Sequence, residues 1–334
     1  MIDAKKVSRH DVTNNQFHTG VHFNMPDEIY HSDPCARPSL SSSIGKVLIA
    51  QSPLHAWTAH PRLNPDFEAG NYRKFDIGKA VHAMLLDDRA ERVQVIDADD
   101  YKTKAAKAER DEALQAGRLP LKTAEYEQAL AIVRAARAAL PKFKEGPAFD
   151  DGVSEVALIW EEPGGVLCRA LIDRMARNRS HLFDVKTEGQ SAHPDAFGRK
   201  IASMGYDFSA AFYLRGFRKC FPDLPPPEWS WLAIETDPPH GVSITGLDAA
   251  GYAIAEHEVE IAIAIWRECL NTGQWPGYPH VKRIIEAKPW VLSAHEELKA
   301  SIGFSTPSDS QAIRDKMFSW QSPITQGETS HENY

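Results

Sequence analysis

The sequence predicts a mixed α/β fold, because strand-like and helix-like patterns alternate through its second half. Three short runs rich in β-branched and other apolar residues follow one another closely, at 153–160, 166–175 and 181–186. The pair Gly164-Gly165 separates the first two runs and is a hairpin turn signal. We therefore expect these two runs to be antiparallel neighbours in one sheet.

Helical patterns surround a further strand. Residues from about 194 to 220 have helical spacing with a break near Gly205, and residues 249–270 form a long amphipathic pattern. Between them, residues 229–236 predict a strand and residues 242–247 an edge strand. The expected buried positions of the last helix are Ile254, Val259, Ile261, Ile265 and Trp266. The element order is therefore helix, three strands, helix, strand, helix.

Helices are also expected in the first half. Serines in the segment 38–43 precede an apolar run, Ile44 to Ala50, which predicts a helix with a serine N-cap. Pro53 marks the expected end of that helix. A second helix is expected at 75–87 because its apolar residues recur with helical spacing.

Residues 102–140 are rich in Ala, Lys, Glu and Arg and predict one or two surface helices, interrupted near Gly117 and Pro120. Their mixed charges favour a solvated face, and a DNA-facing helix is the alternative. The chain is thus expected to comprise a flexible arm (1–25), a helical N-terminal part (26–150), an α/β core (151–300) and a mobile tail (301–334).

Composition excludes several classes of protein. The 334 residues are 43% hydrophobic and can bury a sizeable core, yet no run of about 18 apolar residues could span a membrane. The first residues have no apolar core of a signal peptide, so a cytoplasmic location is expected. The net charge of −8 is mild evidence against a nucleic-acid partner. It is no veto, because contact with a nucleic acid depends on a local basic surface rather than on the net charge.

The four cysteines are scattered and form no Cys-x-x-Cys pair: Cys35, Cys168, Cys220 and Cys269. We expect reduced and mostly buried thiols and no structural zinc.

Chemistry is concentrated on the second and third predicted strands. Asp173 ends the second strand, and Asp184 and Lys186 lie two residues apart on the third. Residues i and i+2 of a strand project from the same face, so Asp184 and Lys186 should project together while Val185 faces the core. The hairpin spacing allows Asp173 to reach the same place.

Two carboxylates at one place can hold Mg²⁺ or Mn²⁺, and a lysine beside them can act on the attacking water or on the phosphate. An exposed salt bridge across a hairpin is the simpler interpretation of an isolated Asp-x-Lys. The apolar flanks argue against it, because carboxylates at the ends of buried strands need a partner.

The order Asp173, then Asp184-Val-Lys186, resembles the PD-(D/E)XK nuclease superfamily. The narrower likeness is to the phage and prophage exodeoxyribonuclease VIII (RecE-like) branch, which is related to RecB-type nuclease domains. It covers roughly residues 28 to 290. It is carried by Gly78-Lys-Ala-Val-His82, by Leu40-Ser-Ser-Ser43 with Ser52-Pro53, and by Gly205-Tyr206 with Ala210-Ala211-x-Tyr213.

The resemblance implies a restriction-endonuclease-like core, a central mixed sheet flanked by helices, with N-terminal helical additions. It makes Asp173, Asp184 and Lys186 the expected catalytic residues. It also implies one or two Mg²⁺ or Mn²⁺ ions per chain, and the cysteine spacing excludes the iron–sulfur cluster of some RecB-type relatives. The candidate metal ligands are His82, Asp173, Asp184, Val185 and Glu155.

Several of these residues have a second interpretation. His82 lies on an apolar helical face and could be a core histidine, and Glu155 could be a half-exposed strand residue. Tyr206 and Tyr213 share a helix face and could pack in the core or contact DNA. Ser209 stands where the branch usually has glutamine, which puts the substrate contact of that position in doubt.

The function expected from the resemblance is 5′-to-3′ exonuclease action on double-stranded DNA in phage-type recombination. It would leave a single strand for an annealing protein, and a ring-shaped homo-oligomer would enclose the DNA. The alternatives are an endonuclease or repair nuclease on the same core, and a DNA-binding protein that has lost catalysis.

Overall fold

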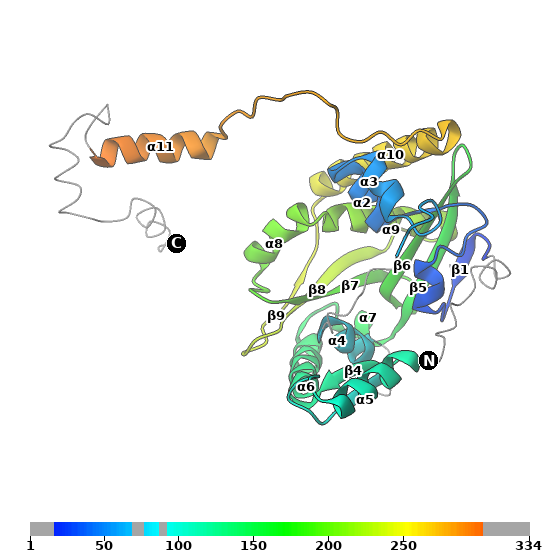
Figure 1. Cartoon of the computed structure of the whole chain (residues 1–334), viewed down its shortest axis with the longest axis vertical. Helices are drawn as coiled ribbons and strands as arrows, with labels where there is room; N and C mark the ends of the chain where they lie inside the picture. Colours follow the sequence, from blue (N-terminus) through cyan, green and yellow to red (C-terminus); the bar gives the residue numbers. More distant parts are fainter. Residues whose placement is uncertain (1–16, 69–76, 87–91, 303–334) are drawn as a thin grey trace. The chain divides into compact units, whose positions relative to one another are not determined.

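The computed structural model describes residues 17–68, 77–86 and 92–302 (Figure 1). The expected arm and tail therefore lie largely outside the described residues. The chain divides into two compact units, one up to Tyr278 and one from Pro279. In the second unit, helix α11 spans Pro289–Ile302. The candidate site belongs entirely to the first unit.

The first unit is built on a seven-stranded mixed sheet with the order β1-β5-β6-β7-β8-β9. Its strands are β1 (Gly20–His22), β5 (Gly152–Glu162), β6 (Val166–Ala176), β7 (His181–Glu188), β8 (Glu228–Glu235) and β9 (Val242–Thr245). Strands β7 and β8 are parallel, and the other neighbours in this order are antiparallel. The short β2 (Leu40–Ser41) adds to β6 in parallel.

The predicted hairpin joins β5 and β6. Gly164 and Gly165 both have φ above +80°, a conformation that glycine adopts without steric cost. The mixed α/β fold with a central sheet and flanking helices is therefore confirmed, as are the three strands and their turn.

Helices cover both faces of the sheet (Figure 1). One face packs on α2 (Ser42–Ala50), α3 (Pro53–Ala59), α8 (Pro194–Ser203), α9 (Tyr206–Cys220) and α10 (Ala249–Thr272). The other packs on α4 (Ile77–Leu86) and α6 (Thr123–Ala139). The other helices of this unit are α1 (Asp27–His31), α5 (Lys104–Gln115), η3 (Leu140–Lys142) and α7 (Gly146–Asp150).

The side chains of β7 divide between these two cores as the alternation of a strand requires. Leu182 belongs to the core under α9, whereas Phe183 and Val185 belong to the core under α4 and α6. Asp184 and Lys186 thus continue the Leu182 face, and Val185 faces the opposite core, as predicted.

Serine caps begin helices α2 and α3. The Ser41 hydroxyl accepts the Ile44 N–H at the start of α2, as expected from the serine-rich segment. Pro53 does more than end this helix. It is the first residue of α3, whose N-cap is Ser52, because proline fits the first turn of a helix without losing a hydrogen bond.

The helices expected in 102–140 and their interruption are confirmed, because α5 ends at Gln115 and α6 begins at Thr123. The interruption contains a strand that the sequence did not predict: residues 119–122 (β4) pair in parallel with residues 93–96 (β3) in a separate two-stranded sheet. The burial predicted for two residues of α10 was wrong. On α10, Ile254 and Ile261 are exposed, while Val259 and Trp266 are fully buried. The buried stripe of this long helix is narrower than its composition suggests, because only one face meets the sheet and α9.

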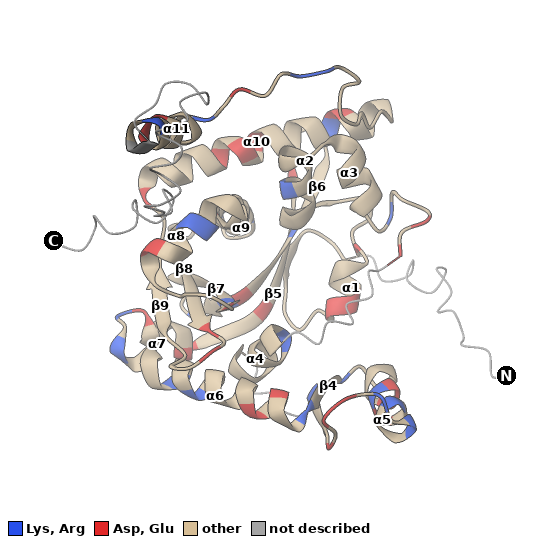
Figure 2. Cartoon of the chain, turned by 60° about the vertical axis from the view of Figure 1, so that its left-hand side comes forward, with Lys and Arg blue, Asp and Glu red and all other residues tan. Residues whose placement is uncertain are grey.

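Other expectations agree with the structure. The cysteines are free and three of the four are buried. No helix among the described residues is long and apolar enough to cross a membrane. Basic and acidic residues are interspersed along α5 and α6, as a solvated face requires (Figure 2).

Candidate active site

The candidate site lies where two strands of the sheet separate. Strands β6 and β7 pair only at Arg174–Phe183 and Met175–Leu182. In this register the next opposed positions are Asp173 and Asp184, so the ladder ends at the two carboxylates. Beyond this fork, β6 takes β2 as its parallel neighbour. Asp173 and Asp184 are therefore the first opposed residues outside the β6–β7 ladder. Asp173 does not end its strand as predicted, because β6 continues to Ala176.

A hydrogen bond holds Asp173 in place across the fork. Its Oδ2 accepts the backbone N–H of Val185 at 2.8 Å, in place of the ladder bond that the diverging strands do not make. The side chain of Asp173 is about one fifth exposed, so its carboxylate remains reachable from outside. The acid is therefore both fixed and accessible.

Asp184 and Lys186 form an ion pair on one face of β7. The Lys186 Nζ donates to Asp184 Oδ1 at 2.7 Å. Burial raises the pKa of Asp184 to about 6, although the positive charge of Lys186 opposes the shift; the charge of Asp173 adds to it. Burial alone would lower the pKa of Lys186, but the two carboxylates outweigh it and raise that pKa. The lysine is therefore held as a cation.

His82 reaches the same place from the other side of the sheet. It projects from α4, with its Nε2 2.9 Å from the carbonyl oxygen of Val185 and its Nδ1 4.0 Å from Asp173 Oδ2. About a third of its side chain is exposed, which is more than a core histidine has. The structure thus brings together His82, Asp173, Asp184, Val185 and Lys186.

Glu155 is less closely associated. It lies on β5 opposite Asp173 in the strand register. Its φ of +50° is unusual for a residue with a side chain, and its carboxylate is 3.8 Å from Arg92 Nη1. Among the described residues, no three His, Cys, Asp or Glu side chains gather as a metal site. Glu155 therefore does not complete a three-carboxylate cluster here.

Helix α9 supplies the aromatic neighbours of the site. The ring of Tyr206 has the Lys186 Nζ 5.2 Å from its centroid. Tyr213 packs edge-on against Trp229, and its hydroxyl is 3.5 Å from Ser42 Oγ, so it belongs largely to the core. Ser209 is buried and its hydroxyl donates to the Gly205 carbonyl within the helix, which favours packing over the predicted substrate contact.

The donor set fits a hard divalent cation. Two carboxylates and the carbonyl of Val185 offer oxygen atoms, which Mg²⁺ and Mn²⁺ prefer, and His82 adds one nitrogen. Burial raises the pKa of Asp184 despite the opposing charge of Lys186, so a further positive charge would stabilise the ionised form of this acid. A bound cation would supply that charge.

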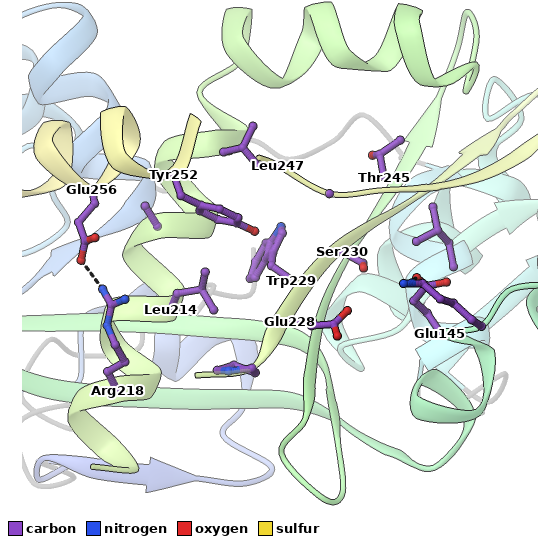
Figure 3. A pocket seen from close by; sticks show the side chains of 15 residues that line it. Glu145, Leu214, Arg218, Glu228, Trp229, Ser230, Thr245, Leu247, Tyr252 and Glu256 are labelled. Atoms are coloured by element: carbon purple, nitrogen blue, oxygen red, sulfur yellow. Dashed lines mark hydrogen bonds and ion pairs between the residues drawn. The ribbon is translucent and has the colours of Figure 1, made fainter. Parts of the chain in front are cut away.

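A separate hollow of about 510 Å³ lies where β8 begins (Figure 3). Trp229 and Tyr252 project into it, and an ion pair between Arg218 and Glu256 borders it. None of the residues at the fork lines it. Its walls mix cations, carboxylates and rings, so it has no clear preference for one kind of ligand.

Comparison with known proteins identifies the fold. Residues 47–284 match the sequence profile of a family described as "PDDEXK-like domain of unknown function (DUF3799)". The chain belongs to this family. The match spans the fork, His82 and all of α9, so the PDDEXK-like core contains every candidate residue discussed above. The resemblance inferred from Asp173 and Asp184-Val-Lys186 is therefore confirmed at the level of the superfamily.

One solved structure has a similar fold over most of the chain. A protein from Eubacterium rectale named "putative exonuclease" superposes with a TM-score of 0.53 at 15% identity, over 81% of this chain and 98% of its own. The structure of SSO0001, also 15% identical, covers 56% of this chain and 85% of its own, but its TM-score of 0.24 carries no argument. No curated protein matches the sequence. At such identities the likeness shows the fold alone.

Proposed function

We propose that the protein is a divalent-metal-dependent deoxyribonuclease that hydrolyses phosphodiester bonds of double-stranded DNA. The observation that supports this best is the fork of β6 and β7. It places Asp173, Asp184 and Lys186 together in a PDDEXK-like fold. A structural salt bridge would not require two carboxylates, one of them strongly perturbed by burial, at the end of a strand pair.

Each residue of the fork has a distinct task in this proposal. Asp173 and Asp184 hold one or two Mg²⁺ or Mn²⁺ ions, with the Val185 carbonyl and His82 as further ligands. Such an ion supplies an activated water and neutralises charge on the phosphate. Lys186, kept cationic beside Asp184, stabilises the negative charge that develops on the phosphate oxygens. The hydrogen bond from the Val185 N–H keeps Asp173 oriented throughout.

The finer activity that we propose is 5′-to-3′ exonuclease action. It rests on the resemblance to the RecE-like branch, and the name of the Eubacterium rectale protein is in line with an exonuclease. An annealing protein as partner, a ring-shaped homo-oligomer and a phage or prophage origin belong to the same proposal.

Cleavage of two DNA forms tests the proposal. Purified protein is incubated with end-labelled linear duplex and with covalently closed circular DNA, with Mg²⁺ or with EDTA, beside the Asp184→Asn variant. We expect Mg²⁺-dependent digestion of the linear duplex only, with a 5′ label released before a 3′ label on the same strand. Cutting of the circle would identify an endonuclease. DNA binding without any cutting by the wild type would identify a non-catalytic protein.

A further inference from the structure

A lysine far from the fork in sequence reaches the same aromatic ring as Lys186. Lys46 lies on α2, directly after Gly45. A Cβ at Gly45 would lie 2.7 Å from the Phe208 ring, so α2 packs on α9 more closely than any larger residue would allow. Because the two helices are so close, the next residue, Lys46, lies beside the start of α9.

A second glycine provides room for the lysine stem. Gly205 is the N-cap of α9 and has φ +62°, and a Cβ built on it would lie 2.9 Å from Lys46 Cδ. The stem therefore crosses the helix start in van der Waals contact, and the Lys46 Nζ ends 5.8 Å from the centroid of the Tyr206 ring. Because the Lys186 Nζ lies 5.2 Å from the same centroid, one ring is shared by two ammonium groups.

Within the described part of the chain, Lys46 has no close counter-charge, in contrast to Lys186. Lys186 is paired with Asp184 at 2.7 Å. Among the described residues, Lys46 donates no hydrogen bond and forms no ion pair; Asp184 and Asp207 act on it only at longer range. Burial, and then the charge of Lys186, lower the pKa of Lys46. A half-buried cation next to a second cation is unfavourable unless an anion completes the site.

We propose that Lys46 binds a backbone phosphate of the DNA strand beside the phosphate that is cut. The inference rests on the proposed nuclease function and assigns to this site a residue outside the motif. Phosphate is the fitting anion because a lysine ammonium offers three donors to its oxygens, and because the fork already presents groups that attract the neighbouring phosphate. Both ammonium groups lie near the ring of Tyr206.

The expected kinetic signature differs from that of Lys186. A contact to a phosphate that does not react is made equally in the substrate complex and in the transition state. Loss of Lys46 should therefore raise the Kd and KM and leave kcat nearly unchanged. Loss of one phosphate contact should also lower the slope of log Kd against log salt by about one.

The first experiment compares Lys46→Gln and Lys46→Arg with the wild type. Lys107→Gln is the matched control, because it removes one exposed positive charge from α5. Binding of a fluorescent duplex is measured by anisotropy with Ca²⁺ between 50 and 200 mM KCl, and cleavage with Mg²⁺ gives kcat and KM. For Lys46→Gln we expect an about tenfold higher Kd and KM, the size of one charge-assisted hydrogen bond. Lys46→Arg and Lys107→Gln should stay within about threefold of the wild type.

The second experiment changes the DNA, so that folding of a variant cannot explain the result. A neutral methylphosphonate replaces one phosphate at a time on either side of the cleaved bond. At one position, the methylphosphonate should weaken binding of the DNA to the wild type about tenfold. The same modified DNA should bind to Lys46→Gln as tightly as unmodified DNA does. The proposal would be overturned if, at every position, the methylphosphonate and Lys46→Gln had additive effects on the free energy of DNA binding. An unchanged salt slope in Lys46→Gln would overturn it as well.

The outcomes also separate this inference from the nuclease proposal. If the wild type cuts DNA and the Lys46 variants behave like it, only the inference about Lys46 is lost. If the wild type binds DNA and never cuts, while Lys46→Gln loses one unit of salt slope, the nuclease proposal fails and the phosphate contact stands. If the wild type does not bind DNA, both fail.

Discussion

Metal binding at the fork should depend on pH through Asp184. Burial raises the pKa of this acid to about 6, and a metal ion must displace its proton. The sign follows directly: the protonated form accumulates below pH 6, so metal affinity falls as the pH falls through 6 and levels off above it. With a pKa of 6, the apparent Mn²⁺ affinity should be about tenfold weaker at pH 5 than at pH 7. An ordinary aspartate would give almost no change over this range.

Isothermal calorimetry with Mn²⁺ at pH 5, 6, 7 and 8 measures this dependence. Because an imidazole ligand also loses affinity when protonated, the titrations are repeated in His82→Gln. The tenfold change should persist in His82→Gln and disappear when Asp184→Asn is added to that variant. The same linkage predicts that Mn²⁺ raises the Tm more at pH 7 than at pH 5. A flat profile in His82→Gln would show that Asp184 ionises normally, and that burial does not control the site.

Three further predictions concern single residues. Lys186→Met should cut DNA about 10²–10³ times more slowly, because one preorganised charge is lost. Its affinity for duplex DNA with Ca²⁺ should remain near that of the wild type. A cleavage rate above a tenth of the wild-type rate would show that Lys186 is not a catalytic residue. His82→Ala should abolish cleavage while the Tm stays within a few degrees, whereas a large fall in Tm with residual cleavage would show a packing residue. Gly45→Ala should place a methyl group 2.7 Å from the ring of Phe208. It should lower the free energy of unfolding by about 1–2 kcal/mol and the Tm, measured by calorimetry, by about 2–8 °C. Gly198→Ala on α8, where the new methyl meets nothing within 4 Å, should instead be neutral or stabilising.

Local signals in the sequence determined most of the core elements. Short runs of β-branched and other apolar residues located β5 to β8, a double glycine located the hairpin, and serine caps located the start of α2. These signals act over a few residues, so they can be recognised without knowledge of the fold. The strand at 119–122 was missed because its pattern is short and contains proline, and its partner lies outside that local window.

The sequence by itself also determined the chemical centre. Asp184 and Lys186 share a face because a strand alternates, and Asp173 lies on the preceding strand of the same hairpin sequence. Only the tertiary structure decided that β6 and β7 separate at Asp173 and Asp184, and that His82 crosses to the Val185 carbonyl. Burial, which raises the pKa of Asp184, depends on helices distant in sequence. The approach of Lys46 to Tyr206 likewise requires α2 to pack on α9, a contact between remote segments that no local pattern encodes.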